Sequence, residues 1–334
     1  MPVVSVGDMS QQFISMRNSG AIKTELARLS NSLSSGQIDD VTAAMNGDTV
    51  RLSGLNYTLA QLDGYGQAAT ETKQILSNIQ SVLGQVDALR QQSSAQLLLV
   101  NDESTVAQVD EAARSGRQTF DVMVATLNKQ VADRSLLGGS AVSNAPLATA
   151  EVMLSDIEFA IGGATTFLAI ETVVNTWFDD PAGGFATVGY AGDTGPLVER
   201  RISETSTVSI DARADNPAVV ATLKSAAMAA LADRLPDMDQ GVRSEMLQAA
   251  GEGLFAASSG LVAMQARVGS AEMIVETTQT EMTARASVLG AERNDLVLAD
   301  PFETASQLQS VQLQLETHFT VTARLSQLSL LRYI

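Results

Sequence analysis

The chain of 334 residues contains no cysteine and a single histidine, His318. The absence of cysteine excludes disulfides and thiol chemistry. Without cysteine or a second histidine, a zinc site is excluded as well. A Ser-His-Asp triad would have to use the ring of His318. That residue lies between Thr317 and Phe319 in a helical pattern, so we interpret it as a packing or interface residue.

Charged residues are scarce and mostly acidic. They make up 18% of the chain, against about 25% in a typical soluble domain. The 21 Lys and Arg residues oppose 38 Asp and Glu residues, which gives a net charge of -17, and no basic cluster stands out. This balance argues against a surface for nucleic acid or anionic lipid, and we predict neither as a partner.

Long apolar runs are missing too. No run approaches the ~18 apolar residues that a membrane-spanning helix needs. The apolar start at residues 2–6 is too short for the hydrophobic part of a signal peptide, and the polar residues Ser10, Gln11 and Gln12 come soon after it. We therefore predict no membrane partner, and any route out of the cell must avoid the usual secretion signal.

Aromatic residues amount to only 4% of the chain. This is little for a large globular core, but it suffices for helix seams built from Leu, Val, Ile, Met and Ala. Such seams are present in several long stretches where apolar residues recur at alternating spacings of three and four. The sequence therefore predicts a mainly α fold of long antiparallel helices.

The two ends of the chain carry matching apolar stripes. We expect them to pair as a coiled coil that buries both ends, and we take this pair as the functional element. An ordinary intramolecular helical bundle would give the same pattern. The candidate subunit-assembly residues are Ile22, Leu26, Leu29 and Leu33 near the start, and Leu308, Val311, Leu315, Phe319, Leu325 and Leu328 near the end.

The distribution of helical apolar spacing, Gly and Pro along the chain predicts five segments. These are an N-terminal helix and loop of the inner coiled coil (1–47), a helical hairpin body (48–139), an inserted small α+β domain (140–235), a returning body helix (236–299) and a C-terminal coiled-coil helix (300–334).

Local signals set finer expectations within these segments. We expect a short mixed segment up to Gly20, a first helix that ends at Ser34 to Gly36, and a loop over 37–47. Ser104 or Asp102 should cap the second helix of the hairpin. In the insert we expect short helices near 147–160 and 166–178, strands at 185–190, 197–203 and 207–212, and a helix over 218–235.

The short motifs do not indicate catalysis. Residues 64–69 and 251–256 spell a loose GxGxxA, but neither follows a strand or opens a βαβ unit. Residues 237–241 begin like a calcium loop but place Gly where the third oxygen ligand belongs. In the insert, Asp179, Asp180, Asp193 and Glu199 form no recognisable arrangement, while Trp177 and Phe178 are expected to anchor its small core. We predict no enzyme activity, no catalytic residue, no metal and no cofactor.

Four stretches together resemble the bacterial flagellin superfamily. They are LARLSNSLSSGQIDD (26–40), NKQVADRSLLGGS (128–140), ARVGSAEM (266–273) and the closing stretch from Asp300 to Ile334. Within the superfamily, they look most like hook-filament junction proteins, the third type of hook-associated protein. Flagellins carry a Leu-Arg-Ile-Asn-type stretch after the first helix, whereas this chain has Gln37, Ile38, Asp39 and Asp40.

The resemblance implies a mechanism of assembly. Members of the superfamily leave the cell unfolded through the flagellar export apparatus, with an export chaperone and without a cleaved signal peptide. Their terminal segments fold and pair when copies join in a helical lattice. The resemblance implies an extracellular place at the hook-filament junction, between a hook-associated protein and flagellin. The alternatives are a flagellin, or a helical stalk that carries a binding domain.

Overall fold

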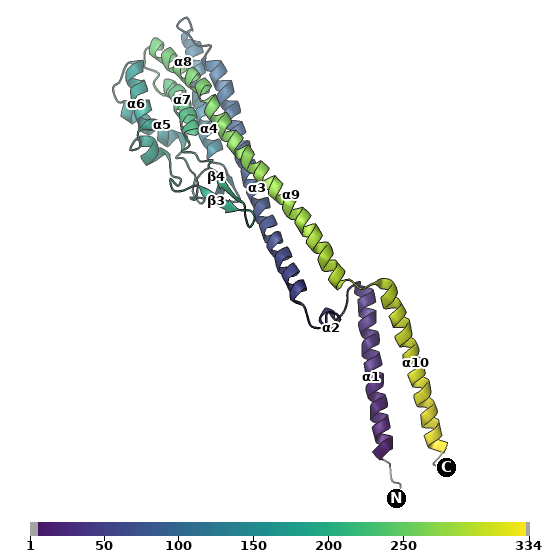
Figure 1. The fold of residues 1–334 in the computed structure, drawn as a ribbon. Coiled ribbons are helices and arrows are strands. Elements are labelled where there is room, and N and C mark those ends of the chain that lie inside the picture. The colour runs from purple at the N-terminus through teal and green to yellow at the C-terminus, as the bar shows by residue number, and fades with distance from the viewer. Residues whose placement is uncertain (1–5, 332–334) are drawn as a thin grey trace. The chain divides into compact units, whose positions relative to one another are not determined.

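The computed structural model describes residues 6–331, and for residues 6–8, 11 and 325–331 it describes the backbone alone. The predicted mainly α class is confirmed, because the described chain consists mainly of long helices (Figure 1). Its only strands form two small antiparallel hairpins. The chain divides into two compact units, Met1–Leu62 with Thr283–Ile334, and Asp63–Met282. The five-segment division is finer than this and stays a prediction.

Helices from both ends of the chain build the terminal unit. Its elements are α1 (Val6–Ser35), α2 (Val41–Ala44), the start of α3 (Val50–Leu97), the end of α9 (Ser258–Val297) and α10 (Pro301–Leu331). Helix α1 begins well before Gly20, so the expected mixed segment was wrong. No proline interrupts residues 6–35, and a single Gly within a helix is tolerated at about 1 kcal/mol relative to Ala.

The loop that follows α1 is more ordered than expected. Gly36 takes φ +70 and ends α1 in the left-handed conformation, as predicted. The Ile38 amide donates to the Val297 carbonyl at 2.9 Å, and the Ala299 amide donates to the Gly36 carbonyl at 3.1 Å. The expected loop over 37–47 also contains α2, whose first turn is capped by Asp40. The exits of α1 and α9 are thus hydrogen-bonded to each other.

Helix α10 starts where the sequence predicts. Asp300 Oδ1 accepts from the amides of Phe302 at 2.8 Å and Glu303 at 3.1 Å, and Pro301 fills the first position. These contacts satisfy amides that have no partner within the helix.

The second unit contains the helical body and the insert. Helix α4 (Val106–Leu127) is capped by Thr105, which forms a capping box with Gln108, so the expected cap at Ser104 or Asp102 was wrong. In this box the Gln108 amide donates to Thr105 Oγ1 at 3.4 Å, and the Thr105 amide donates to Gln108 Oε1 at 2.8 Å. Two amides at the start of the helix are thereby satisfied. Strands β1 (Gln130–Val131) and β2 (Arg134–Ser135) then form a tight hairpin.

The insert keeps its predicted helices but loses one predicted strand. Helices α5 (Ala150–Ile161) and α6 (Phe167–Asp179) and strands β3 (Val198–Arg201) and β4 (Thr207–Ile210) are confirmed, and β3 pairs with β4 in antiparallel register. Residues Phe185–Gly189 form a π-helix, η1, rather than a strand. Its buried residues are Phe185 and Gly189, four positions apart in the sequence. Both pack against Trp177.

Trp177 is the centre of this part of the core, as predicted. Only 4% of the residue is exposed. Its ring packs edge-on against Phe178 at 4.6 Å, and its Nε1 donates to Asp156 at 2.7 Å. The hydrogen bond satisfies the indole N–H that burial would otherwise leave without a partner.

The last helix of the insert belongs to the helical body. Helix α7 (Pro217–Arg234) packs on both α4 and α8 (Gln240–Ala256) (Figure 1). A Cβ added at Gly116 of α4 would lie 2.7 Å from the Ala229 Cβ of α7. The two helices approach this closely because both present small residues at the contact.

Candidate assembly interface

Helices α1 and α10 lie side by side in the terminal unit (Figure 1). A row of side chains that are shielded from solvent follows spacings of three and four on both helices, as a coiled-coil seam requires. Glu25, Arg28 and Ala305, which lie beside this row, are also partly shielded. The row consists of Ser15, Ser19, Ile22, Leu26, Leu29 and Ser32 on α1 and of Thr304, Leu308, Val311, Leu315 and His318 on α10.

The predicted assembly residues are covered to different extents. Leu29 is buried, with 3% exposed, whereas Leu33 is 40% exposed and Phe319 is 50% exposed. The side chains of Leu325 and Leu328 lie outside the described residues. The remaining five, Ile22, Leu26, Leu308, Val311 and Leu315, are half-buried. One pair of helices therefore covers only part of its own seam.

Most polar residues at the seam were missed from the sequence, whereas His318 was predicted to have a packing or interface role. His318 Nε2 lies 3.5 Å from Ser15 Oγ, while His318 Nδ1 is buried without a partner. Ser32 is buried and accepts from the Asp39 amide at 3.0 Å, and Thr304 is 7% exposed. Continuing the spacing back by four from Leu308 would have found Thr304, and continuing it forward by three from Leu315 leads to His318.

Charges line the edge of the pair. The Arg28 guanidinium donates to Glu25 at 2.5 Å, and this hydrogen bond lowers the pKa of the Glu25 carboxyl. Lys23 Nζ lies 5.7 Å from the centre of the Phe319 ring, within the range of a cation-π contact. The first contact lies within α1, and the second joins α1 to α10. The outer faces of both helices stay exposed to solvent.

Large apolar side chains are exposed on the outer faces of the terminal unit. Scattered apolar residues are normal on a surface, but a concentration of them indicates an interaction site. They include Met9, Phe13, Ile14 and Met16 on α1, Leu313 and Val321 on α10, and Phe302 at the start of α10. Four of these, within residues 9–16, are between 53% and 69% exposed.

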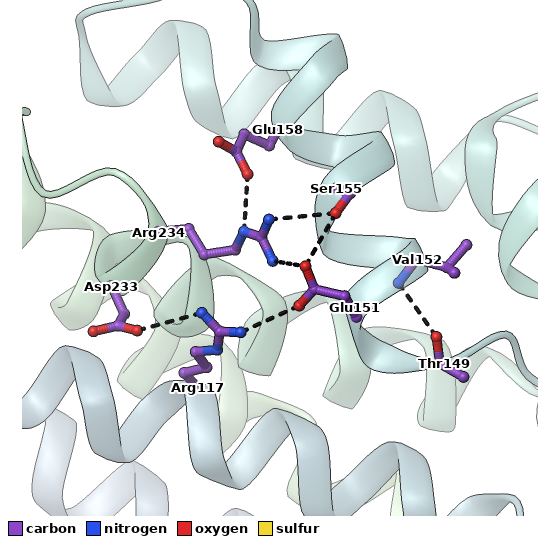
Figure 2. A network of polar contacts seen from close by, with 8 residues as sticks. All are labelled: Arg117, Thr149, Glu151, Val152, Ser155, Glu158, Asp233 and Arg234. Atoms are coloured by element: carbon purple, nitrogen blue, oxygen red, sulfur yellow. Dashed lines mark hydrogen bonds and ion pairs between the residues drawn. The ribbon is translucent and has the colours of Figure 1, made fainter.

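In the second unit, five charged side chains form a network between helices (Figure 2). Arg234 Nη1 and Nε donate at 2.8 Å to Glu151 and Glu158, and Arg117 reaches Glu151 at 3.2 Å and Asp233 at 3.8 Å. The hydrogen bond from Arg234 lowers the pKa of Glu151. Because each cation has a carboxylate partner, the network joins α4, α5 and α7 rather than offering a reactive group.

Of the acidic residues singled out in the insert, Asp179, Asp180 and Asp193 have structural partners. Asp179 pairs with Lys224 at 2.6 Å, and Asp193 accepts from Ser140 Oγ at 2.6 Å. Asp180 accepts from the Ala182 amide at 2.8 Å. Within residues 6–331, no three His, Cys, Asp or Glu side chains gather in a way that could hold a metal ion. No helix in the same range has the length and apolar character needed to cross a membrane.

Comparisons with known proteins point to the same elements. Residues 254–334 match the family model for the bacterial flagellin C-terminal helical region. This end of the chain is flagellin-like. The matched residues include α10 and thus one of the two helices of the candidate interface. No curated protein sequence matches the chain.

Solved structures share the fold of the chain at low sequence identity. FlgL of Bacillus cereus is 14% identical, with a TM-score of 0.51 over 71% of this chain and 96% of that one. A putative flagellar hook-associated protein from Vibrio parahaemolyticus is 10% identical, with a TM-score of 0.51 over 74% of this chain and 96% of that one. The three proteins share a fold.

Proposed function

We propose that the chain is a structural subunit that joins the flagellar hook to the flagellar filament and assembles through its terminal helices. The observation that carries the proposal is the half-covered seam between α1 and α10, with large apolar residues exposed on the outer faces. Neighbouring copies would complete that burial. The flagellin-like C-terminal region supports a flagellar location.

Assembly couples folding to contact between copies. Most helix stability in proteins comes from packing of an apolar face rather than from the helix itself. Leu29 is the one predicted seam residue that the pair buries fully among those whose side chains are described. In this proposal, the terminal segments are loosely ordered in the free subunit and become rigid when adjacent copies cover them. Growth is then confined to the tip of the polymer, where such neighbours exist.

The partners follow from this role. Copies of the chain join in a helical lattice, in which each contact joins two different patches head to tail. A hook-associated protein lies on the hook side and flagellin lies on the filament side. The subunit reaches this extracellular place through the flagellar export apparatus with an export chaperone. The role requires no catalytic group, metal or cofactor.

The resemblance of the folded chain to a hook-associated protein and to FlgL favours the junction over the filament. A flagellin remains the second candidate, because the family match covers a region named for flagellin. Abundance separates the two. A junction subunit should be a trace component of sheared flagella and should be found by immunogold labelling at the end of the hook, whereas a filament subunit would dominate and label the whole length.

Truncation tests the terminal-pairing mechanism itself. A chain without residues 325–334 should remain a soluble monomer that does not assemble, while the thermal unfolding of the unit Asp63–Met282 stays unchanged. Normal incorporation of the truncated chain into flagella would contradict the mechanism.

A further inference from the structure

A cavity of about 460 Å³ opens in the second unit. Its volume lies within the range of cavities that bind ligands in proteins. Its apolar lining comes from α3, from the β1-β2 hairpin and from strands β3 and β4. The residues that matter for the argument are Ile75, Val131, Val198 and Ile210. Neither the predicted terminal pairing nor the charge network of Figure 2 uses this cavity.

Three charged residues line the cavity, and their charges do not cancel. Glu71 Oε1 lies 3.2 Å from Arg200 Nη1 and 3.9 Å from Arg134 Nη1. One carboxylate thus serves two guanidinium groups, which leaves one positive charge in excess. Each guanidinium has five N–H donors, so both keep donors for a further acceptor. In a chain with a net charge of -17, this is a local site for an acidic group.

The hairpin that forms part of the wall closes with a two-residue turn. Ala132 and Asp133 take φ values of 50 and 57, as the common two-residue hairpin turn with positive φ at both central residues requires. They form the turn that sets Val131 and Arg134 beside the cavity. The hairpin belongs to the 128–140 stretch that carries part of the family resemblance.

The chain itself contains a side chain suited to this cavity. Phe302 is 86% exposed at the start of α10, between the carboxylates of Asp300 and Glu303. Within the described chain, neither carboxylate pairs with a Lys or Arg; Asp300 accepts from helix amides and Glu303 accepts from Gln307.

Phe159, which is slightly more exposed than Phe302, is a poorer match. Phe159 is 88% exposed, but the neighbouring Glu158 is already paired with Arg234 at 2.8 Å. Phe302 is therefore the better complement to a cavity with an apolar lining and an excess positive charge, and Phe159 serves as the matched control.

We propose that the cavity receives Phe302 of a second copy, with Asp300 and Glu303 of that copy facing Arg134 and Arg200. The inference rests on the proposed function and names one contact between copies in the lattice. Because a knob on one unit enters a cavity on the other unit of the next copy, the contact is heterologous and can repeat without closing.

A photocrosslink tests the contact in assembled material. Phe302 is replaced by the photoreactive benzoylphenylalanine, and flagella carrying the variant are irradiated and digested. Crosslinks are expected to the cavity wall of another copy, within residues 71–78, 131–142 and 198–212. The same replacement at Phe159 should give no crosslink to these residues. Flagella that contain the Phe302 variant but lack such crosslinks would overturn the proposal.

A binding measurement in solution does not depend on assembly. A peptide of residues 298–312 is titrated into the full-length chain, and saturable binding is expected. Phe302→Ala in the peptide, or Arg200→Glu in the chain, should weaken binding at least tenfold. The control Arg201→Glu, on the same strand but outside the cavity lining, should leave it unchanged. Glu303→Arg in the peptide should restore binding to the Arg200→Glu chain.

The two measurements separate the contact from the role. Equal binding by the normal and Phe302→Ala peptides, or no binding by either, would refute the contact while leaving the junction role in place. Peptide binding by a chain that is absent from flagella would refute the junction role while supporting the contact.

Discussion

Phe13→Ala tests whether the exposed apolar residues of α1 become buried on assembly. Phe13 is 69% exposed in the single chain. Burying an apolar side chain of this size completely stabilises by about 1.5 to 3 kcal/mol, so covering the exposed fraction contributes about 1 to 2 kcal/mol per contact. Since about 1.4 kcal/mol corresponds to a factor of ten, the variant should need roughly five to thirty times more protein to assemble.

The assay is the concentration of chain left in solution when assembled material is sedimented from a dilution series. Phe159→Ala is the matched control, because Phe159 is as large and 88% exposed but lies in the second unit. It should assemble at the normal concentration, and both variants should show the normal thermal unfolding of that unit. If Phe13→Ala also assembled at the normal concentration, or if Phe159→Ala were equally impaired, the outer face of α1 would not be the interface.

Three further predictions concern single features of the fold. His318→Leu removes a buried nitrogen without a partner, which costs about 1 to 3 kcal/mol, so assembly should occur at a lower concentration in the same sedimentation assay; a higher concentration would mean that the ring makes a needed contact. Gly116→Ala should lower the melting temperature of the second unit, because the added Cβ would lie 2.7 Å from the Ala229 Cβ. Its control, Gly84→Ala, adds a Cβ in open space within a helix and should raise the free energy of unfolding by about 0.5 to 1 kcal/mol. Equal shifts in the two variants would refute the close packing of α4 on α7. Burial, followed by the charge of Asp215, raises the pKa of Tyr190 to about 12. Because the unfolded chain then loses this proton at a lower pH than the folded chain does, the free energy of unfolding should fall as the pH rises from about 10 towards 12. An ultraviolet titration should show one tyrosine that ionises last, and Tyr190→Phe should abolish that step.

The terminal pairing illustrates what the sequence can predict. Ile22, Leu26 and Leu29 follow spacings that only a helix brings to one face, and their shielding in the pair agrees with this. The same pattern could not show where α1 begins, since Ser, Gln and Met carry no signal that ends a helix. It also could not show that Leu33 is 40% exposed while Ser32 is buried, because the loop amide that Ser32 accepts comes from beyond the helix.

Long-range packing set the limits of prediction in the insert. Residues 185–189 form a short apolar run that suits a strand or a helical turn equally well, and the position of Trp177 decides between them. Helix α7 is rich in Ala on all sides, so its sequence alone could not show that it packs on both α4 and α8. The cavity beside the β1-β2 hairpin was not predicted either, because residues more than a hundred positions apart line it.

Hydrogen exchange read by mass spectrometry, on the free full-length chain and on assembled material, tests the proposed mechanism most directly. Amides of α1 and α10 should exchange rapidly in the free chain and become protected on assembly, whereas buried stretches of α4 and α7 should be protected in both states. Equal and strong protection of α1 and α10 in the free chain would contradict assembly by completion between copies.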